Sequence, residues 1–458
     1  MKTIFRYIFI ALLILSIFSC KKFLDKEPIA QRTNITNEQE AKSAVIGMYR
    51  LMLSAYSYGQ STVIVPEFSA QHVNHAASYP EYVEFSQNKI RSDNPWTLNI
   101  WNATYATINS ANNIIKSVAG IPVNVINEDK RKQFIQEAKF VRALNYFTLV
   151  RAFGAVPLLT VPTEEDSNLR PSRTAVAQVY AQIIADLKDA SELPNGYTNT
   201  EETKGRATGF AAKALLSKVQ LYQASTTNDY SESARIANEV ITTGGFILPN
   251  DFSTIWTDEN TTESIFELQF DAQATNTLAS VSNPNASMLF YAHGASIADL
   301  YEASDKRRDF TVYQGNAQAD PPDPKYYIGK YRQFSPPVQN FPVIRLGEIL
   351  LIHAEAKARL DGNVSEAAYN SYKAVRDRAG LTTPLRSTFT SVAAFVTAVQ
   401  HEKRLELMFE GEAWFDYCRT GLALTEMMSI ADRNYFLYPI PASERLVNTN
   451  LSQNNGYN

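Results

Sequence analysis

The sequence has 458 residues, which is enough for one large domain with insertions or for two or three smaller domains. Hydrophobic residues make up 45% and charged residues 20%, so the composition is that of a folded globular protein and excludes a disordered chain. The formal net charge of -4 offers no electrostatic basis for binding nucleic acid, and we expect no such partner.

The first nineteen residues have the pattern of an export signal. Two basic residues near the start precede an apolar run, Ile8 to Ile17, that is too short to span a bilayer comfortably. The run leads into Ile17-Phe18-Ser19-Cys20, which resembles the lipobox of bacterial lipoproteins. We therefore predict a lipoprotein signal peptide over residues 1–19, lipid attached to Cys20, and a lipidated tether over residues 20–36.

From residue 37 onward, apolar residues recur at helical spacing in several segments. Asn37 and Glu40 have the spacing of a capping box, and Gly154 followed by Pro157 ends the longest segment. The sequence therefore predicts a mostly α fold, which we treat as a single domain over residues 37–458. The predicted helices span residues 38–53, 96–118, 128–153, 176–193, 207–224, 230–242, 345–360 and 364–379.

Two pairs of these helices are predicted to form hairpins. In the fifth and sixth predicted helices, small residues such as Ala211 and Ala237 allow close helix approach. The last two are joined through Gly362, which can take the left-handed conformation at a helix end. Helix pairs of this kind are typical of tetratricopeptide-like repeats of about 34 residues.

Two long segments lack helical spacing and are predicted to be irregular insertions. The first covers about residues 54–95, where we expect a long surface loop with short strands. The second covers about residues 261–340; it opens with the strand-like stretch SIFELQF and is otherwise rich in Asn, Pro, Gly and Tyr. Long loops on a rigid scaffold often carry binding sites, so both insertions are candidate sites.

The sequence contains none of the common motifs for phosphate, metal or nucleophilic chemistry, and we expect no cofactor and no metal. His72 and His75 are three residues apart, but a metal site needs a further ligand that the sequence does not supply. His353 falls in the apolar stripe of its predicted helix, which indicates a hydrogen-bonded core histidine. Cys418, among apolar and aromatic neighbours, is predicted to be a buried and inert thiol.

The stretch from His401 to Gly421 has two interpretations. Glu402, Glu406 and Glu410 are four residues apart and would share one helix face. Paired carboxylates can act as general acid and base, which would make the protein an exported hydrolase. Ion-paired carboxylate stripes are far more common, so a structural role is the preferred interpretation.

Both insertions combine aromatic rings with amide and imidazole groups. Sugar recognition uses this mixture, because a pyranose ring lays its C–H patches on aromatic faces while its hydroxyls need polar partners. The alternative is that the rings only hold long loops in place. The candidate ligand-binding residues are His72, Asn74, His75, Tyr79, Tyr82 and Trp96 in the first insertion, and Phe290, Tyr291 and His293 in the second.

Segments along nearly the whole chain resemble the SusD/RagB family of outer-membrane lipoproteins from Bacteroidetes-type bacteria. They occur in the family's order, which makes chance agreement improbable. The segments are KKFLDKEP after Cys20, AKFVRALNYFTLVRAFGAVPLL, GRATGFAAKALLSKVQLYQAS, FPVIRLGEILLIHAEAKARLDG with VRDRAGL, KRLELMFEGEAWFDYCRTG, and LYPIPASERLVNTNLSQNNGY.

The resemblance implies a SusD-like fold of tetratricopeptide-like helix pairs with an irregular ligand-binding part. It implies a lipid-anchored protein at the outer membrane that caps a SusC-like TonB-dependent transporter and delivers a nutrient, commonly a glycan, for import. It also implies sugar contacts in the two insertions. The sequence lacks an adjacent pair of tryptophans such as starch binders can show, so the glycan stays open.

The same resemblance implies a binding protein and not an enzyme. The carboxylates of the 401–421 stretch then belong to a buried or half-buried ion-pair network that includes Arg404, with Trp414 and Phe415 as its apolar lock. Two alternatives remain. The family architecture could serve peptides or another non-glycan nutrient, or the protein could be a surface scaffold without a small ligand.

Overall fold

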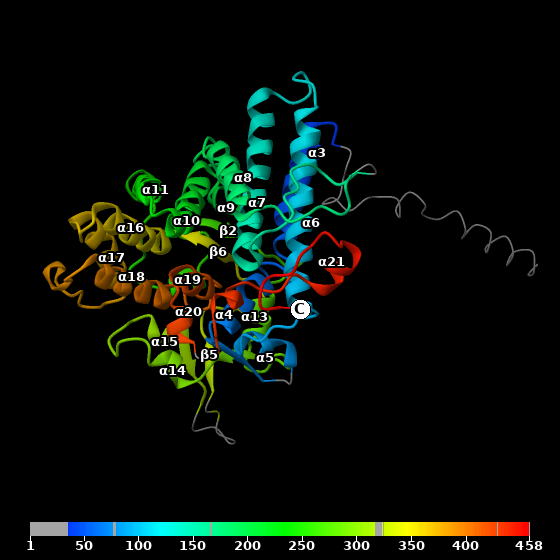
Figure 1. The fold of residues 1–458 in the computed structure, drawn as a ribbon. Helices are drawn as coiled ribbons and strands as arrows, with labels where there is room; N and C mark the ends of the chain where they lie inside the picture. Colours follow the sequence, from blue (N-terminus) through cyan, green and yellow to red (C-terminus); the bar gives the residue numbers. More distant parts are fainter. Residues whose placement is uncertain are drawn as a thin grey trace, which may run out of the picture.

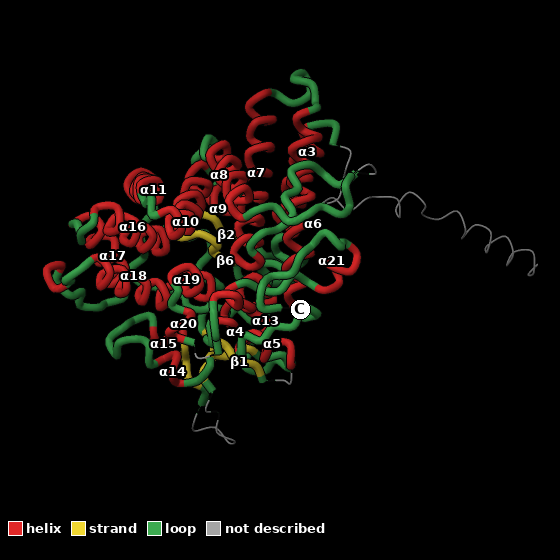
Figure 2. Tube along the Cα trace, in the orientation of Figure 1, coloured by secondary structure: helices red, strands yellow, loops and turns green. Residues whose placement is uncertain are grey.

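The computed structural model describes residues 35–76, 79–164, 167–316, 323, 325–427 and 429–457 (Figure 1). The predicted signal peptide, Cys20 and nearly all of the predicted tether lie outside the described residues. The fold is mostly helical with a few short strands, as the sequence predicts (Figure 2). None of the described helices is both long and apolar enough to cross a membrane.

Each of the predicted helices is present. The helix that follows Asn127 has the predicted bounds, because the Asn127 side chain accepts a hydrogen bond from the Lys130 amide and caps it. The long helices are α3 Glu38–Leu51, α6 Pro95–Ala119, α7 Glu128–Phe153, α8 Val176–Ala190, α10 Gly209–Thr227, α11 Ser231–Thr243, α16 Leu346–Asp361, α17 Glu366–Arg378 and α18 Val392–Glu406.

The predicted hairpins form and pack on each other. Helices α10 and α11 lie side by side, α11 packs on α16, and α16 packs on α17 and α18 (Figure 1). Ala211 and Ala237 are fully buried, so small residues do allow the close approach that the sequence indicates. Gly362 ends α16 in the left-handed conformation with φ 64°.

Short strands connect distant parts of the chain in three antiparallel pairs among the described residues. Strands β1 Val73–His75 and β3 Phe290–Ala292 join the two insertions. Strands β2 Ser264–Leu268 and β6 Phe341–Arg345 form the ends of the second insertion, and β6 leads directly into α16. The third pair, β4 Val312–Gln314 and β5 Tyr326–Ile328, lies within that insertion.

The first insertion is not the surface loop that the sequence analysis expects. Residues Ser61–Ser69 form the helix α4, all of which is buried, and Pro80–Ser86 form α5. The residues from Val63 to Val65 and Phe68 are apolar and buried in the core. The free energy gained by burying them stabilises this helix although its sequence lacks the periodicity of a surface helix. The remaining short helices are α9 Thr200–Gly205, α12 Thr254–Thr257, α13 Thr277–Ser282, α14 Ala295–Ala298, α15 Arg308–Thr311, α19 Ala413–Thr420, α20 Ala423–Glu426 and α21 Ala442–Val447, with 3-10 turns at Arg386–Thr388 and Arg433–Phe436.

The three carboxylates of the 401–421 stretch are buried, but they do not share one helix. Helix α18 ends at Glu406, and Glu410 follows in a turn where Phe409 has φ 68°. The predicted single helix face was therefore wrong for Glu410. Glu402 and Glu406 are fully buried, and Glu410 is nearly so.

Buried cations converge on these carboxylates and confirm the ion-pair network. Arg345 lies 2.5 Å from Glu406 and 2.7 Å from Glu410, and Arg307 lies 2.8 Å from Glu406 and 2.6 Å from Glu402. The remaining members of the network, which we call the ion cluster, are Glu263, Asp305, Lys330, Arg376 and Arg378. Burial by itself would raise the pKa of the Glu406 carboxyl, but its arginine partners hold that pKa well below the ordinary value.

Three predicted members of this network lie elsewhere. Arg404 points away and donates a hydrogen bond to His72, because it lies on a different face of α18 from Glu402 and Glu406. Trp414 lies parallel to the Tyr438 ring at 6.4 Å, and the Phe415 ring packs under the Arg151 guanidinium at 4.4 Å. Trp414 and Phe415 are both buried, and the ring contacts that the structure shows for them are with Tyr438 and Arg151.

His353 has the predicted structural role, whereas Cys418 is less buried than predicted. His353 is buried, with Nδ1 2.8 Å from the Ser371 hydroxyl on the neighbouring α17. Burial lowers the pKa of His353 to about 4. Cys418 is half-buried, and burial raises the pKa of its thiol well above the ordinary value, as expected for an inert cysteine.

We predict that Glu406→Gln lowers the free energy of unfolding by about 3–5 kcal/mol, because it leaves buried guanidinium groups without their counter-charge. Denaturant titration at neutral pH measures the effect. The control is Asp377→Asn, which breaks an exposed pair with Lys373 and should cost less than about 1 kcal/mol. Equal losses in the two variants would contradict a central role for Glu406.

We also predict that His353 makes stability depend on pH. Its folded pKa of about 4 lies below the ordinary 6.5, so the unfolded chain takes up a proton first as the pH falls. The free energy of unfolding should therefore fall between pH 6.5 and 4, by up to about 3 kcal/mol. In His353→Gln the decline should be smaller by this amount. If the free energies of unfolding of the wild type and of His353→Gln differ by the same amount from neutral pH to pH 4, His353 is not the source of the pH dependence.

Candidate functional site

The two insertions meet in the small antiparallel pair of β1 and β3. Asn74 lies opposite Tyr291, His75 lies opposite Phe290, and the His293 amide donates to the His72 carbonyl at 2.9 Å. The candidate residues from the two insertions, distant in sequence, are therefore neighbours in space.

The two faces of this pair differ. Phe290 is fully buried, and Val73 and Ala292 are buried with it. Asn74 and Tyr291 share the opposite face, since residues opposite each other in an antiparallel pair point the same way, and both are partly exposed. Asn74 and Tyr291 are therefore partly exposed on one face of the pair, whereas His75, opposite Phe290, lies on the other face and is also partly exposed.

A buried aromatic layer supports this region. Tyr82 stacks on Phe68 and on Trp96, with ring centroids 4.7 and 4.8 Å apart, and the Phe290 ring stands at 79° to it with the centroids 5.0 Å apart. The Tyr82 hydroxyl accepts a hydrogen bond from Gln60 at 3.1 Å. Tyr82 and Phe290 are fully buried, so their prediction as ligand contacts was wrong: they pack against neighbouring rings inside the protein.

His72 is also not a ligand contact. It is fully buried, its Nδ1 lies 2.7 Å from a Glu67 carboxylate oxygen, and its Nε2 accepts from the Arg404 Nε at 3.2 Å. Burial lowers the pKa of His72, although the Glu67 carboxylate opposes the shift. Both ring nitrogens have protein partners, so His72 holds the base of β1 against α18.

The partly exposed candidates lie around both faces of the β1–β3 pair, and we call them together the aromatic shelf. His75 and Tyr79 lie against the buried Tyr82, with ring centroids 5.8 and 6.1 Å from it. Trp96 is half-buried, and His293 is exposed. The shelf thus offers ring faces beside amide and imidazole groups. Its members are Asn74, His75, Tyr79, Trp96, Tyr291 and His293.

The structure adds tyrosines that sequence reasoning missed. Strand β5 packs beside β3, and its Tyr326 is partly exposed. On β4, the Tyr313 ring lies 3.9 Å below the Arg332 guanidinium. The available signal was the tyrosine-rich composition of the second insertion, but the pairing of β4 with β5 is needed to place these rings.

No group of three or more His, Cys, Asp or Glu residues is arranged to hold a metal ion anywhere in the part of the chain that the structure describes. The accessible groups of the shelf are rings, amides and imidazoles. Such a surface can bind a ligand by stacking and hydrogen bonding.

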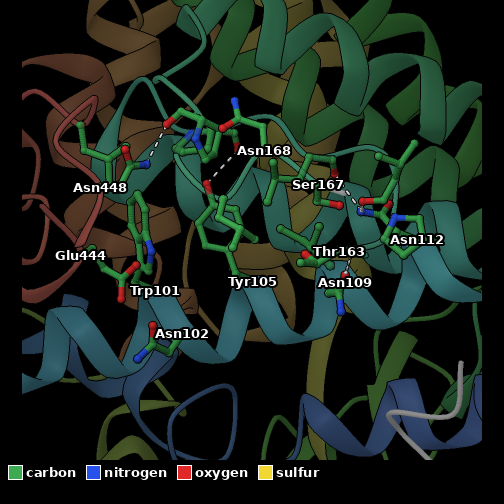
Figure 3. Close-up of a pocket in the computed structure, with 18 of the residues that line it drawn as sticks. Trp101, Asn102, Tyr105, Asn109, Asn112, Thr163, Ser167, Asn168, Glu444 and Asn448 are labelled. Atoms are coloured by element: carbon green, nitrogen blue, oxygen red, sulfur yellow. Dashed lines mark hydrogen bonds between the residues drawn. The ribbon is translucent and has the colours of Figure 1, made fainter. Parts of the chain in front are cut away.

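A separate cavity of about 530 Å³ lies along α6 (Figure 3). Its floor includes Trp101 and Tyr105, its second wall comes from residues 157–163 and 167–171, and its third from residues 444–451. Sequence reasoning did not single out these residues. Trp101 and Tyr105 have the spacing of a helix face, but the walls come from distant segments.

Comparisons with known proteins agree with this architecture. The family model described as "Starch-binding associating with outer membrane" matches residues 22–221, and the model described as "SusD family" matches residues 322–431. SusD-like protein P2 of Formosa agariphila is 26% identical over 514 aligned residues, which cover 97% of this chain and 98% of that protein.

Solved structures also match over almost the full chain. A SusD superfamily protein from Parabacteroides distasonis superposes with a TM-score of 0.80 at 25% identity, covering 93% of this chain and 100% of that one. A laminarin binding SusD-like protein superposes with a TM-score of 0.78 at 26% identity, covering 92% and 100%.

Proposed function

Because this chain belongs to the SusD/RagB family, we propose that it is a glycan-binding lipoprotein of the cell surface that delivers its ligand to a SusC-like TonB-dependent transporter. The observation that carries the glycan part is the aromatic shelf, where partly exposed rings lie beside amide and imidazole groups. The laminarin-binding relative supports the same ligand class.

In this proposal the ligand binds across β1 and β3. Tyr291, Tyr79 and Trp96 offer ring faces to pyranose C–H patches, while Asn74, His75 and His293 supply hydrogen-bonding groups for the hydroxyls. Each contact is weak, so long or repeated glycans bind more tightly than short ones through several contacts at once.

The proposed location rests on the N-terminal sequence and on a family model whose description names association with the outer membrane. Signal peptide 1–19 is removed, lipid on Cys20 anchors the chain, and residues 20–36 form the tether. A lipid-anchored chain at the outer membrane is placed to cap a transporter in that membrane. The glycan then passes from the binding lipoprotein into the transporter.

The exported-hydrolase alternative has no support in the carboxylates that suggested it. Glu402 and Glu406 are fully buried and paired with arginines, so they have no access to a substrate. Glu406 also has a strongly lowered pKa, which is unsuited to a general acid. These groups stabilise the fold.

We predict that Tyr291→Ala and His293→Ala each weaken glycan binding by about 3–10-fold, the loss expected for one stacking or hydrogen-bonding contact. The measurement is calorimetry of the full chain in detergent with laminarin, after a glycan array has identified any better ligand. Tyr56→Ala is the control, since that tyrosine is 52% exposed and lies outside the shelf. If glycan binding is unchanged in both variants, the glycan binds outside the aromatic shelf. If no glycan on the array is bound, the proposed function is refuted.

We predict that Cys20→Ser moves the protein from the membrane fraction to the periplasmic or culture fluid, because stable anchoring requires the lipid. Fractionation followed by detection of the chain measures the change. Cys418→Ser is the matched control and should stay in the membrane fraction. A membrane-bound Cys20→Ser protein would contradict lipid attachment at this residue.

A further inference from the structure

A second cavity, of about 580 Å³, shares no residue with the aromatic shelf or with the cavity along α6. It lies where the end of α7, the start of α8, the end of α10, α19 and the turn Arg433–Phe436 meet. Its lining comes from within residues 150–154, 176–180, 222–227, 415–419 and 433–437, all of which the structure describes. We call it the arginine cavity.

Every charged side chain among the described residues that line this cavity is an arginine, namely Arg151, Arg419 and Arg433. Arg151 pairs with Glu412 at 2.7 Å, and Arg419 pairs with Glu355 at 2.9 Å. Neither carboxylate lines the cavity. The charges of these two arginines are therefore balanced from behind the wall, and no anionic side chain faces a ligand.

Arg433 is the cation that has no counter-charge. It is exposed, and no carboxylate of the described residues forms an ion pair with it. Its guanidinium lies over the Phe436 ring, with the central carbon 5.4 Å from the ring centroid. A guanidinium that is free on the edge of a cavity is suited to bind a carboxylate through two parallel hydrogen bonds.

Aromatic side chains form much of the remaining wall. Tyr222, Phe415 and Phe436 are buried and Tyr180 is half-buried, and all four line the cavity. The Arg151 guanidinium carbon lies 4.4 Å from the Phe415 ring centroid, a contact that holds this ring in place. A flat apolar group can therefore pack against several rings in stacked or edge-on contact.

Most polar side chains of the lining already have partners. The hydroxyls of Ser225, Thr226 and Thr227 donate to carbonyls of their own helix, and the Cys418 thiol donates to the Phe436 carbonyl. These groups are not available as donors to a ligand.

Three polar side chains of the lining have no hydrogen-bond partner among the described residues: Tyr180, Gln223 and Arg433. Burial raises the pKa of Tyr180 to about 12, so its hydroxyl is protonated at neutral pH and can donate. The cavity thus offers one cationic donor and two neutral donors beside aromatic walls.

We infer that the arginine cavity binds a small aromatic carboxylate. The carboxylate pairs with Arg433, the ring packs against the aromatic walls, and Gln223 and Tyr180 donate to the oxygens that remain. The volume of about 580 Å³ lies within the range of small-ligand pockets. This site is additional to the proposed glycan site and does not depend on it.

The test is calorimetry of the full chain in detergent with 4-hydroxybenzoate, which should bind. Arg433→Gln should weaken binding by at least about tenfold, the loss expected for a charge-assisted hydrogen bond. Arg386→Gln is the matched control and should change nothing. Arg386 is also exposed and also begins a 3-10 turn, but it does not line the cavity.

Two further compounds separate the contributions of charge and ring. The neutral 4-hydroxybenzamide keeps the ring, and acetate keeps the charge, so each should bind at least about tenfold more weakly than 4-hydroxybenzoate. Arg433→Gln should not weaken the binding of 4-hydroxybenzamide further.

A second variant tests the location. Ala177 is exposed and lines the cavity, so Ala177→Trp should fill it and abolish the binding of 4-hydroxybenzoate while the fold is kept. Thermal unfolding checks that both variants fold. Tyr291→Ala, which alters the aromatic shelf, should bind 4-hydroxybenzoate as the wild type does.

Four results would overturn the inference: no binding of 4-hydroxybenzoate, equal affinity for 4-hydroxybenzoate and 4-hydroxybenzamide, binding that neither Arg433→Gln nor Ala177→Trp changes, or binding that is lost in Tyr291→Ala. The glycan proposal is judged separately, by titration of laminarin against the same variants. Loss of laminarin binding in Tyr291→Ala but not in Arg433→Gln supports two independent sites.

Discussion

The buried ion cluster is the interaction on which the rest of the structure depends. It brings together the end of α18, the start of α16, the end of α17 and residues from the second insertion. Packing at its centre is so close that a Cβ on Gly347 would lie 2.7 Å from a Glu406 oxygen and 2.9 Å from Arg345. A side chain at this position would force these ion-paired groups to move. The charges are stable in the interior because nearly every one faces an opposite charge within hydrogen-bond distance.

The cluster also positions the candidate binding surface. Glu263, Arg307 and Lys330 belong to the second insertion, and each pairs with a residue of the helical scaffold. These contacts fix the insertion at several points along its length. The strand β3, which lies between Glu263 and Arg307 in the sequence, is thereby held where it can pair with β1. The ion cluster thus helps to position the residues of the aromatic shelf.

Helix α6 forms part of both the aromatic shelf and the cavity along it. Trp96 in its first turn belongs to the shelf, whereas Trp101, Tyr105 and Asn109 further along form the floor of the cavity. The two surfaces differ in what remains free. The shelf presents rings with polar groups beside them, while the cavity is lined by apolar side chains together with amides, hydroxyls and the Glu444 carboxylate.

The sequence by itself determined eight helices of the scaffold, their pairing into hairpins, the family and the burial of the 401–421 carboxylates, because these follow from local spacing, caps and recurring segments. Only the tertiary structure decided which candidate side chains face solvent. His72 is covered by Arg404, 332 residues away, and Tyr82 by Phe290, so no local pattern could show that they are buried. The cavity along α6 is likewise formed only where three segments that are distant in the sequence pack together. Exposure is a property of long-range packing, and local sequence patterns do not encode it.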